Sequence, residues 1–182
     1  SSASSNRVLV VKYPAFTDDM SVKMESFKKR LGQMPYVVRV SISGAVPGVE
    51  VANYFTNRPY GSDPSEVKLI QMFAVDYDFL ALYSPEMLCG RGFSEAYGNE
   101  RNKVVLNEEA VRLLGYPSPE EALGKQLEME VLEDPLEVVG VVKNYHQQSL
   151  AEPYKPILFF LKERVPFIAT PYISVKMDGP VN

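Results

Sequence analysis

Residues 102–160 read NKVVLNEEAVRLLGYPSPEEALGKQLEMEVLEDPLEVVGVVKNYHQQSLAEPYKPILFF, and this stretch decides the fold. It opens with an apolar run at 103–106 that is typical of a strand. Asn107 follows where its side chain can cap a short helix, and Gly115 can form the left-handed exit of that helix. The stretch therefore predicts a strand followed at once by a short capped helix.

The second half of the same stretch predicts a one-turn helix, a hairpin and another strand. Ser118-Pro119-Glu120-Glu121 is a capping box with proline at the first helical position, and Gly124 ends the turn. Residues 126–132 and 136–142 are two strand-like runs separated by Glu133-Asp134-Pro135, which predicts an antiparallel hairpin. Residues 157–161 are apolar throughout and predict a further strand.

The chain before this stretch begins with a strand, a helix and a strand. Residues 8–13 form a β-branched run that predicts a strand buried on both faces. A helix is expected from Thr17-Asp18-Asp19 to Gly32, before Pro35, and a half-buried strand at 36–43. One apolar stripe lies along that helix and is expected to pack on a sheet: Met20, Met24, Phe27, Leu31 and Met34. This order predicts a βαβ-type unit.

The segments between these regions alternate strands with irregular structure. Residues 49–63 are expected to form a surface loop or hairpin, and 66–75 a strand. A short helix is expected at 76–83 and a connector at 85–98. Residues 172–177 supply a last strand. Strands joined by both hairpins and helices predict the α+β class.

Composition excludes several function classes. The 182 residues carry a net charge of −4, which is no footprint for nucleic acid, and 46% hydrophobic content is ample for a core. The densest basic cluster, Lys28-Lys29-Arg30, falls at a helix C-terminus, where the helix dipole explains it. Cys89 is the single cysteine, so no internal disulfide or cysteine-based zinc site is predicted. No run reaches the ~18–20 apolar residues that cross a bilayer.

Histidine and cysteine offer little for catalysis. His146 is the single histidine, and Cys89 lies far from it in sequence. The simpler interpretation of His146 is a loop imidazole hydrogen-bonded beside Tyr145. Ser94 and Ser149 lack the Gly-x-Ser-x-Gly pattern of a hydrolase.

Glycines and carboxylates also favour structural roles. The Gly90-Arg91-Gly92 sequence is a turn and lacks the features of a phosphate-binding loop. The carboxylate pairs lie in first turns of helices or on solvent faces of strands, and neither Asp18-Asp19 nor Asp76-x-Asp78 has the pattern of a calcium loop. We therefore predict no catalytic, cofactor-binding or metal-binding residues.

Six short sequence motifs, taken in order, carry a resemblance to a known family. They are DYDFL (76–80), GRGFS (90–94), VVLNEEAVRLLG (104–115), LGKQL (123–127), VVGVVKNYHQQSL (138–150) and KPILFF (155–160). In this order they resemble the extracytoplasmic core domain of MacB/FtsX-type ABC-transporter permeases. The resemblance is strong over 67–161 and weaker over 7–48.

The resemblance implies a two-lobed architecture. An α/β porter-like lobe with βαβ units is expected from residues 7–75 with 155–182, and an inserted β-rich lobe from 76–154. The Gly90-Arg91-Gly92 turn and the Gly140 region are candidate borders between the lobes. In the family a helix and a strand follow the strand at 172–177, so the terminal lobe is expected to be incomplete or completed by a neighbouring chain.

The resemblance also implies function. It suggests a non-catalytic domain on the periplasmic side of the inner membrane, which couples cytoplasmic ATP hydrolysis to export or signalling by lobe movement and protein contact. Implied partners are an ATP-binding cassette domain or subunit, and a periplasmic adaptor, lipoprotein or peptide cargo, with a homodimer in the full transporter. Cofactors and nucleic acid are not expected. The alternative is a free-standing periplasmic ligand-binding or adhesion module.

Overall fold

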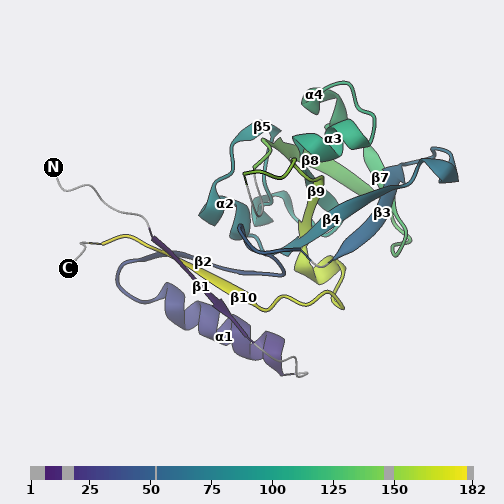
Figure 1. The fold of residues 1–182 in the computed structure, drawn as a ribbon. Coiled ribbons are helices and arrows are strands. Elements are labelled where there is room, and N and C mark those ends of the chain that lie inside the picture. The colour runs from purple at the N-terminus through teal and green to yellow at the C-terminus, as the bar shows by residue number, and fades with distance from the viewer. Residues whose placement is uncertain (1–6, 14–18, 52, 146–149, 180–182) are drawn as a thin grey trace.

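The computed structural model describes residues 7–13, 19–51, 53–145 and 150–179, and its strands form one mixed sheet with few helices (Figure 1). The strands are β1 (Arg7–Lys12), β2 (Val37–Ser43), β3 (Tyr54–Pro59), β4 (Lys68–Val75), β5 (Met87–Gly90), β6 (Lys103–Asn107), β7 (Gln126–Met129), β8 (Leu136–Val142), β9 (Ile157–Leu161) and β10 (Tyr172–Met177). The α-helices are α1 (Met20–Gly32), α2 (Phe79–Tyr83), α3 (Glu108–Leu113) and α4 (Pro119–Ala122). The predicted α+β class is confirmed.

Both ends of the chain build a small three-stranded layer, which we call the terminal unit (β1, α1, β2 and β10). β10 lies between β1 and β2 and is antiparallel to both, so β1 and β2 run parallel. The predicted βαβ-type unit is therefore present with a third strand inserted. Helix α1 covers one face of the layer (Figure 1) and packs on Val40, Ile42, Ile173 and Val175.

The prediction that β1 is buried on both faces is wrong, because all six of its residues are exposed. Strand β1 pairs with β10 alone, so it is an edge strand of the described sheet. Helix α1 packs chiefly against β2 and beside β10. Leu9 and Val11, which lie opposite Val175 and Ile173 in the ladder, consequently remain 53% and 38% exposed.

The stripe predicted for α1 is largely confirmed. Met24 is buried between helix and sheet, and Met20, Phe27 and Leu31 pack around it. Met34 does not belong to the stripe, because the helix ends at Gly32 and Met34 is 54% exposed.

Six other strands close into a ring, which we call the barrel unit together with β5 and helices α2–α4. The ring order is β3, β4, β9, β6, β8, β7 and back to β3. The β4–β9 and β6–β8 pairs are parallel and the other four are antiparallel. The predicted 126–142 hairpin is confirmed as the β7–β8 pair. Because the ring is closed, each of these six strands pairs with a neighbouring strand on both sides, as in a small barrel.

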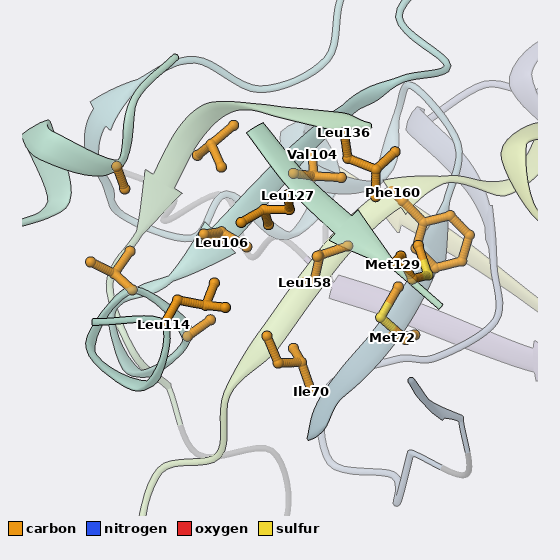
Figure 2. Packing of buried hydrophobic residues seen from close by; sticks show 14 of the residues in the cluster. Ile70, Met72, Val104, Leu106, Leu114, Leu127, Met129, Leu136, Leu158 and Phe160 are labelled. Atoms are coloured by element: carbon orange, nitrogen blue, oxygen red, sulfur yellow. The ribbon is translucent and has the colours of Figure 1, made fainter. Parts of the chain in front are cut away.

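The interior of the ring is filled by apolar side chains (Figure 2). Successive residues of a strand point to opposite faces, so every second residue faces inward. The inward set includes Ile70, Met72, Ala74, Val104, Leu106, Leu127, Met129, Leu136, Val138, Leu158 and Phe160. Helices α3 and α4 lie at one end of the ring (Figure 1), and Ala110, Ala122 and Leu114, which directly follows α3, join its core. The ring is therefore a packed core without a channel.

The alternate residues of β4 and β9 face outward and meet α2. Phe73 and Phe159 are fully buried there against Phe79, with ring centroids 6.5 and 6.1 Å from the Phe79 ring. Helix α2 thus lies on the outside of the ring. It also contacts β2, which places it between the barrel unit and the terminal unit (Figure 1).

Several local predictions are confirmed at atomic detail. The Asn107 side chain accepts a hydrogen bond from Ala110 N at 3.0 Å, and Ser118 Oγ accepts one from Glu121 N at 3.3 Å. Gly115 has φ +86°, the left-handed exit that the sequence predicts. Two segments differ from the prediction: β3 forms inside the expected loop or hairpin, and β5 forms inside the expected connector.

Candidate functional site

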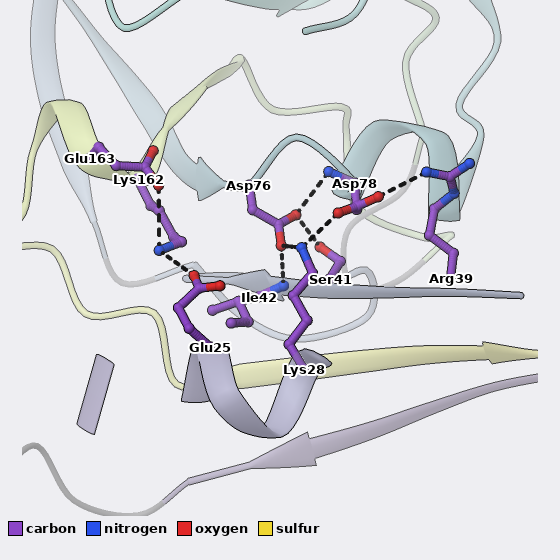
Figure 3. Close-up of polar contacts among 9 residues, drawn as sticks. All are labelled: Glu25, Lys28, Arg39, Ser41, Ile42, Asp76, Asp78, Lys162 and Glu163. Carbon is purple, nitrogen blue, oxygen red and sulfur yellow. Dashed lines mark hydrogen bonds and ion pairs between the residues drawn. The ribbon is translucent and has the colours of Figure 1, made fainter. Parts of the chain in front are cut away.

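The junction between the two units carries a cluster of charged and polar groups (Figure 3). We call it the junction cluster, and it consists of Lys28, Arg39, Ser41, Ile42, Asp76 and Asp78. Lys28 comes from α1, the next three residues from β2, and the two aspartates from the turn between β4 and α2. The cluster therefore connects both layers of the terminal unit to the start of α2.

Asp76 is the centre of the cluster. Its side chain is buried, with the residue 6% exposed. It accepts hydrogen bonds from Lys28 Nζ and Ser41 Oγ, both at 2.8 Å, and from the backbone nitrogens of Ile42 at 2.7 Å and Asp78 at 3.1 Å. A buried carboxylate requires such compensation, because removing a charge from water without partners is costly.

Asp78 lies nearer the solvent and bridges two cations. Its carboxylate accepts hydrogen bonds from Lys28 Nζ at 2.6 Å and Arg39 Nη1 at 2.8 Å. Burial acts to raise the pKa of Asp78, but hydrogen bonds and charge from Lys28 and Arg39 lower it overall. Burial likewise acts to lower the pKa of Lys28, whereas the two carboxylates raise it overall. Both residues are consequently charged at neutral pH.

A second polar link joins α1 to the segment after β9. Lys162 Nζ lies 3.0 Å from Glu25 Oε1 and 3.5 Å from Glu163 Oε1 (Figure 3). The Lys162 side chain is only 16% exposed. Burial acts to lower the pKa of Lys162, and the two glutamates raise it overall. Helix α1 is thus tied to the barrel unit at two places along its length.

Backbone and hydroxyl contacts complete the junction. Ser43 pairs with Val75, the one β2–β4 register pair, and Gly44 N donates to Ala74 O at 2.8 Å. The Tyr83 and Ser174 hydroxyls are 2.6 Å apart, which links α2 to β10. These contacts are mainly polar. Chemically, the junction can hold the terminal unit and the barrel unit together in water.

A pocket of about 340 Å3 adjoins the junction on the side of α2. Aromatic and proline side chains form most of its wall, and Glu86 and Lys143 lie in it, 3.5 Å apart as an ion pair. Tyr145 also lines the pocket. Apart from Glu86, no carboxylate of the described residues lines it, so the pocket offers no pair of titratable acids for hydrolysis.

Of the residues considered for chemistry in the sequence, Cys89 and Ser94 lie in the described part of the chain. Cys89 lies half-buried in β5, where burial raises the pKa of its thiol. Ser94 Oγ accepts a hydrogen bond from Ala96 N. His146 and Ser149 lie outside the described residues. Within the described ranges, no three histidine, cysteine, aspartate or glutamate side chains gather where a metal ion could bind.

The Gly90-Arg91-Gly92 turn and Gly140, which the sequence suggests as a border between lobes, are direct neighbours in the structure. Gly90 pairs with Gly140 in the β5–β8 ladder, inside the barrel unit. A Cβ atom on Gly140 would lie 2.2 Å from Arg91 O, and one on Gly90 would lie 2.2 Å from Val139 O. Glycine is needed at both positions because two backbones approach closely there.

Sequence reasoning missed the junction cluster. It assigned Lys28 to the helix dipole, yet the Lys28 ammonium binds two aspartates 48 and 50 residues away. The available signal was the pair Asp76-x-Asp78, directly after an apolar strand. Two carboxylates at a strand end need cations from elsewhere in the fold.

Comparison with known proteins places this chain in a family. The profile of the MacB-like periplasmic core domain matches residues 1–174. The uncharacterised ABC transporter permease YvrN of Bacillus subtilis strain 168 is 32% identical over 122 residues, which are 63% of this chain and 29% of that relative. The chain thus spans under a third of the curated relative that it matches.

Two solved structures share the fold. The extracellular domain of the ABC-type transporter YknZ from Gram-positive bacteria superposes with a TM-score of 0.64 at 15% identity, covering 95% of this chain and 84% of that one. The periplasmic region of MacB from Actinobacillus actinomycetemcomitans gives 0.62 at 16% identity, covering 97% and 76%. Among the described residues, no helix has both the length and the apolar character that crossing a bilayer requires. The profile match covers nearly the whole sequence, and this chain belongs to the MacB-like periplasmic core domain family.

Proposed function

We propose that this chain is the extracytoplasmic domain of an ABC-transporter permease and that it is not itself catalytic. The observation that supports this most is the family match over residues 1–174, together with a permease as curated relative. The domain would then lie on the periplasmic side of the inner membrane. ATP would be hydrolysed by a cytoplasmic ATP-binding cassette domain or subunit.

We further propose that the domain acts by movement of the terminal unit against the barrel unit. The barrel unit has a close-packed interior, so it moves as one body. The junction rests on charged pairs and a few hydrogen bonds, such as Lys28 with Asp76 and Asp78. Polar interfaces of this kind resemble transient interfaces between domains, which permit relative motion.

The strand ladders support unit boundaries that differ from the division by sequence. Strands β3, β4 and β9 lie in the ranges 7–75 and 155–182, and their ring partners are β6 and β7. We therefore propose a terminal unit of residues 7–13, 19–43 and 172–179, and a barrel unit of 54–145 and 150–168, which includes Val165 and Ile168 of the ring core. Movement of the terminal unit against the barrel unit would then bend the two segments of the chain that connect them.

A cross-link across the junction tests this mechanism. The full-length protein would carry Cys89→Ser with Arg39→Cys and Asp78→Cys, both partly exposed positions on opposite sides of the junction. A short bis-maleimide should then abolish ATP-dependent turnover in the membrane-inserted transporter. N-ethylmaleimide, which modifies both thiols without joining them, should leave most of it.

A control pair joins two residues of one unit. Val8→Cys with Lys176→Cys places thiols on directly opposed residues of β1 and β10. Linking them should not change turnover, because no motion within the terminal unit is proposed. Equal turnover in the linked and unlinked junction variants would refute the coupling by unit movement.

Partners and location follow from the same proposal. We propose that the domain contacts a periplasmic adaptor, a lipoprotein or a peptide cargo, and that two permease units assemble in the transporter. Tyr60 is 58% exposed, so Tyr60→Cys in a Cys89→Ser background offers an accessible thiol. A membrane-impermeant maleimide should label it in intact cells, and labelling only after lysis would contradict the periplasmic location.

A further inference from the structure

We propose that the pocket beside α2 binds a small uncharged aromatic molecule of about two fused rings. This inference does not rest on the assignment as a permease. It rests on the shape, the lining and the position of the pocket.

Aromatic residues are the largest group in the wall of the pocket, with four of the nine described lining residues. Phe79 and Phe159 line the pocket and are almost completely buried, with 1% and 0% of their surface exposed. Tyr83 stacks at a tilt on Phe79, with ring centroids 4.8 Å apart, and Tyr145 adds a fourth ring. Aromatic faces attract other rings in offset or edge-to-face arrangements. The wall therefore selects a flat, apolar group over a branched polar one.

The volume sets the size of the ligand. An apolar cavity of about 150 Å3 can hold one benzene ring. The pocket is open to solvent on one side and has a volume of about 340 Å3, somewhat more than twice that of the benzene cavity. It also lies within the ~300–1,000 Å3 range of small-molecule sites, at the lower end. A bicyclic ligand fills this space better than a single-ring side chain.

The charges at the pocket favour a neutral ligand. Glu86 and Lys143 neutralise each other, and their side chains are 66% and 60% exposed, so they lie at the rim. Burial raises the pKa of the Tyr145 and Tyr83 phenols, so both remain uncharged. The described residues that line the pocket therefore carry no net charge to attract an anion or a cation.

The pocket lies where the two units meet. Pro47 enters its wall from the segment that leaves β2, whereas Phe159 enters from the ring strand β9. Ligand pockets form preferentially at boundaries between domains. A bound molecule would contact both sides of this boundary.

Indole is a suitable probe of this site. Titrated into the 15N-labelled 182-residue chain, it should give saturable amide shifts confined to segments 44–48, 79–86 and 143–145. A ligand of this size is expected to bind with high-micromolar to millimolar affinity. Tryptamine and indole-3-acetate carry the same ring with opposite charges, and neither should bind more tightly than indole.

Two blocking variants and one control complete the test. Pro47→Trp and Pro85→Trp each place a large ring at the pocket, and each should weaken indole binding at least tenfold. Val22→Trp adds the same side chain on α1, where the residue is 68% exposed, and should not change the affinity. Two blocking positions guard against one variant failing to fold.

Three results would contradict this proposal. Shifts that spread over the surface and grow linearly with indole, or unchanged binding in both blocking variants, would overturn the site. Tenfold tighter binding of either charged analogue would overturn the neutral ligand class. None of these results would bear on the permease assignment or on the proposed unit movement, which the cross-linking experiment tests separately.

Discussion

Replacing Asp76 by alanine is expected to lower the free energy of unfolding by about 3 to 4 kcal/mol. The variant removes the acceptor of four hydrogen bonds at the junction. Two of the donors, Ser41 Oγ and Ile42 N, belong to residues that are 0% and 2% exposed, and water cannot easily replace the carboxylate there.

The magnitude follows from these donors. An unsatisfied buried donor costs about 1–3 kcal/mol, so Ser41 and Ile42 together account for most of the loss. Lys28 adds less, because its ammonium keeps Asp78 at 2.6 Å and its side chain is 22% exposed. Asp76→Asn keeps a side-chain oxygen for one of the buried donors, so it should cost about half as much.

Urea unfolding followed by circular dichroism measures the effect. For a slope of about 2 kcal/mol/M, the midpoint of Asp76→Ala should fall by roughly 1.5 to 2 M. Asp19→Ala is the matched control, since Asp19 pairs with Lys23 at 3.9 Å on a surface where both side chains are at least 70% exposed. That control should cost no more than about 0.5 kcal/mol. An Asp76→Ala midpoint close to that of Asp19→Ala would refute the assignment of Asp76 as the centre of the junction.

Three further predictions concern the junction, β5 and α3. Burial alone would raise the pKa of Asp78, but the neighbouring Lys28 ammonium and Arg39 guanidinium lower this pKa below its ordinary value of 3.8 overall. The contribution of the ionised Asp78 to stability is therefore complete above about pH 5 and is lost as the pH falls further. The stability difference between wild type and Asp78→Asn, measured by urea unfolding from pH 7 to pH 2.5, should therefore shrink only at the acid end. Gly140→Ala should lower the free energy of unfolding by about 3 kcal/mol or more, because the new Cβ would lie 2.2 Å from a backbone carbonyl oxygen. The control Gly32→Ala meets no atom within 4 Å, so it should be neutral or stabilising in thermal unfolding. Asn107→Ala should cost roughly 3 kcal/mol, because Asn107 serves two backbone amides and a carbonyl in a buried place, against about 1 kcal/mol for the exposed cap Ser118→Ala. Equal losses at Asn107 and Ser118 would mean that capping alone explains both.

Local signals predicted most of the elements correctly. The cap at Asn107, the left-handed Gly115 and the Ser118 capping box each depend on residues within four positions, so they can be read from sequence. The hairpin of β7 and β8 likewise needs only its own turn. Strand β3 was missed because Asn57 and Pro59 are poor strand residues, and its place in the ring is given by its ladders with β4 and β7.

Long-range arrangement could not be predicted in the same way. The run at 8–13 has the composition of a central strand, yet β1 is an edge strand in the described sheet, and nothing in its own residues distinguishes the two cases. Ring closure depends on the parallel pairing of β4 with β9, which are about 85 residues apart in the sequence. The hydrogen bonds of Asp76 with Lys28 and Ser41 could not be predicted for the same reason, because these residues are far apart in the sequence.

Helix α2 is the element on which these findings converge. Its N-terminal approach carries Asp76 and Asp78, which bind α1 and β2, and its C-terminal half carries Tyr83, which binds β10 and lines the pocket. The buried face of the helix is fixed on the ring by Phe79. Because α2 is only five residues long, it has little capacity to absorb a displacement within itself. A shift of the terminal unit would therefore be transmitted through α2 to both the aspartates and the pocket. This short helix is consequently the best position at which to measure the proposed movement between the two units.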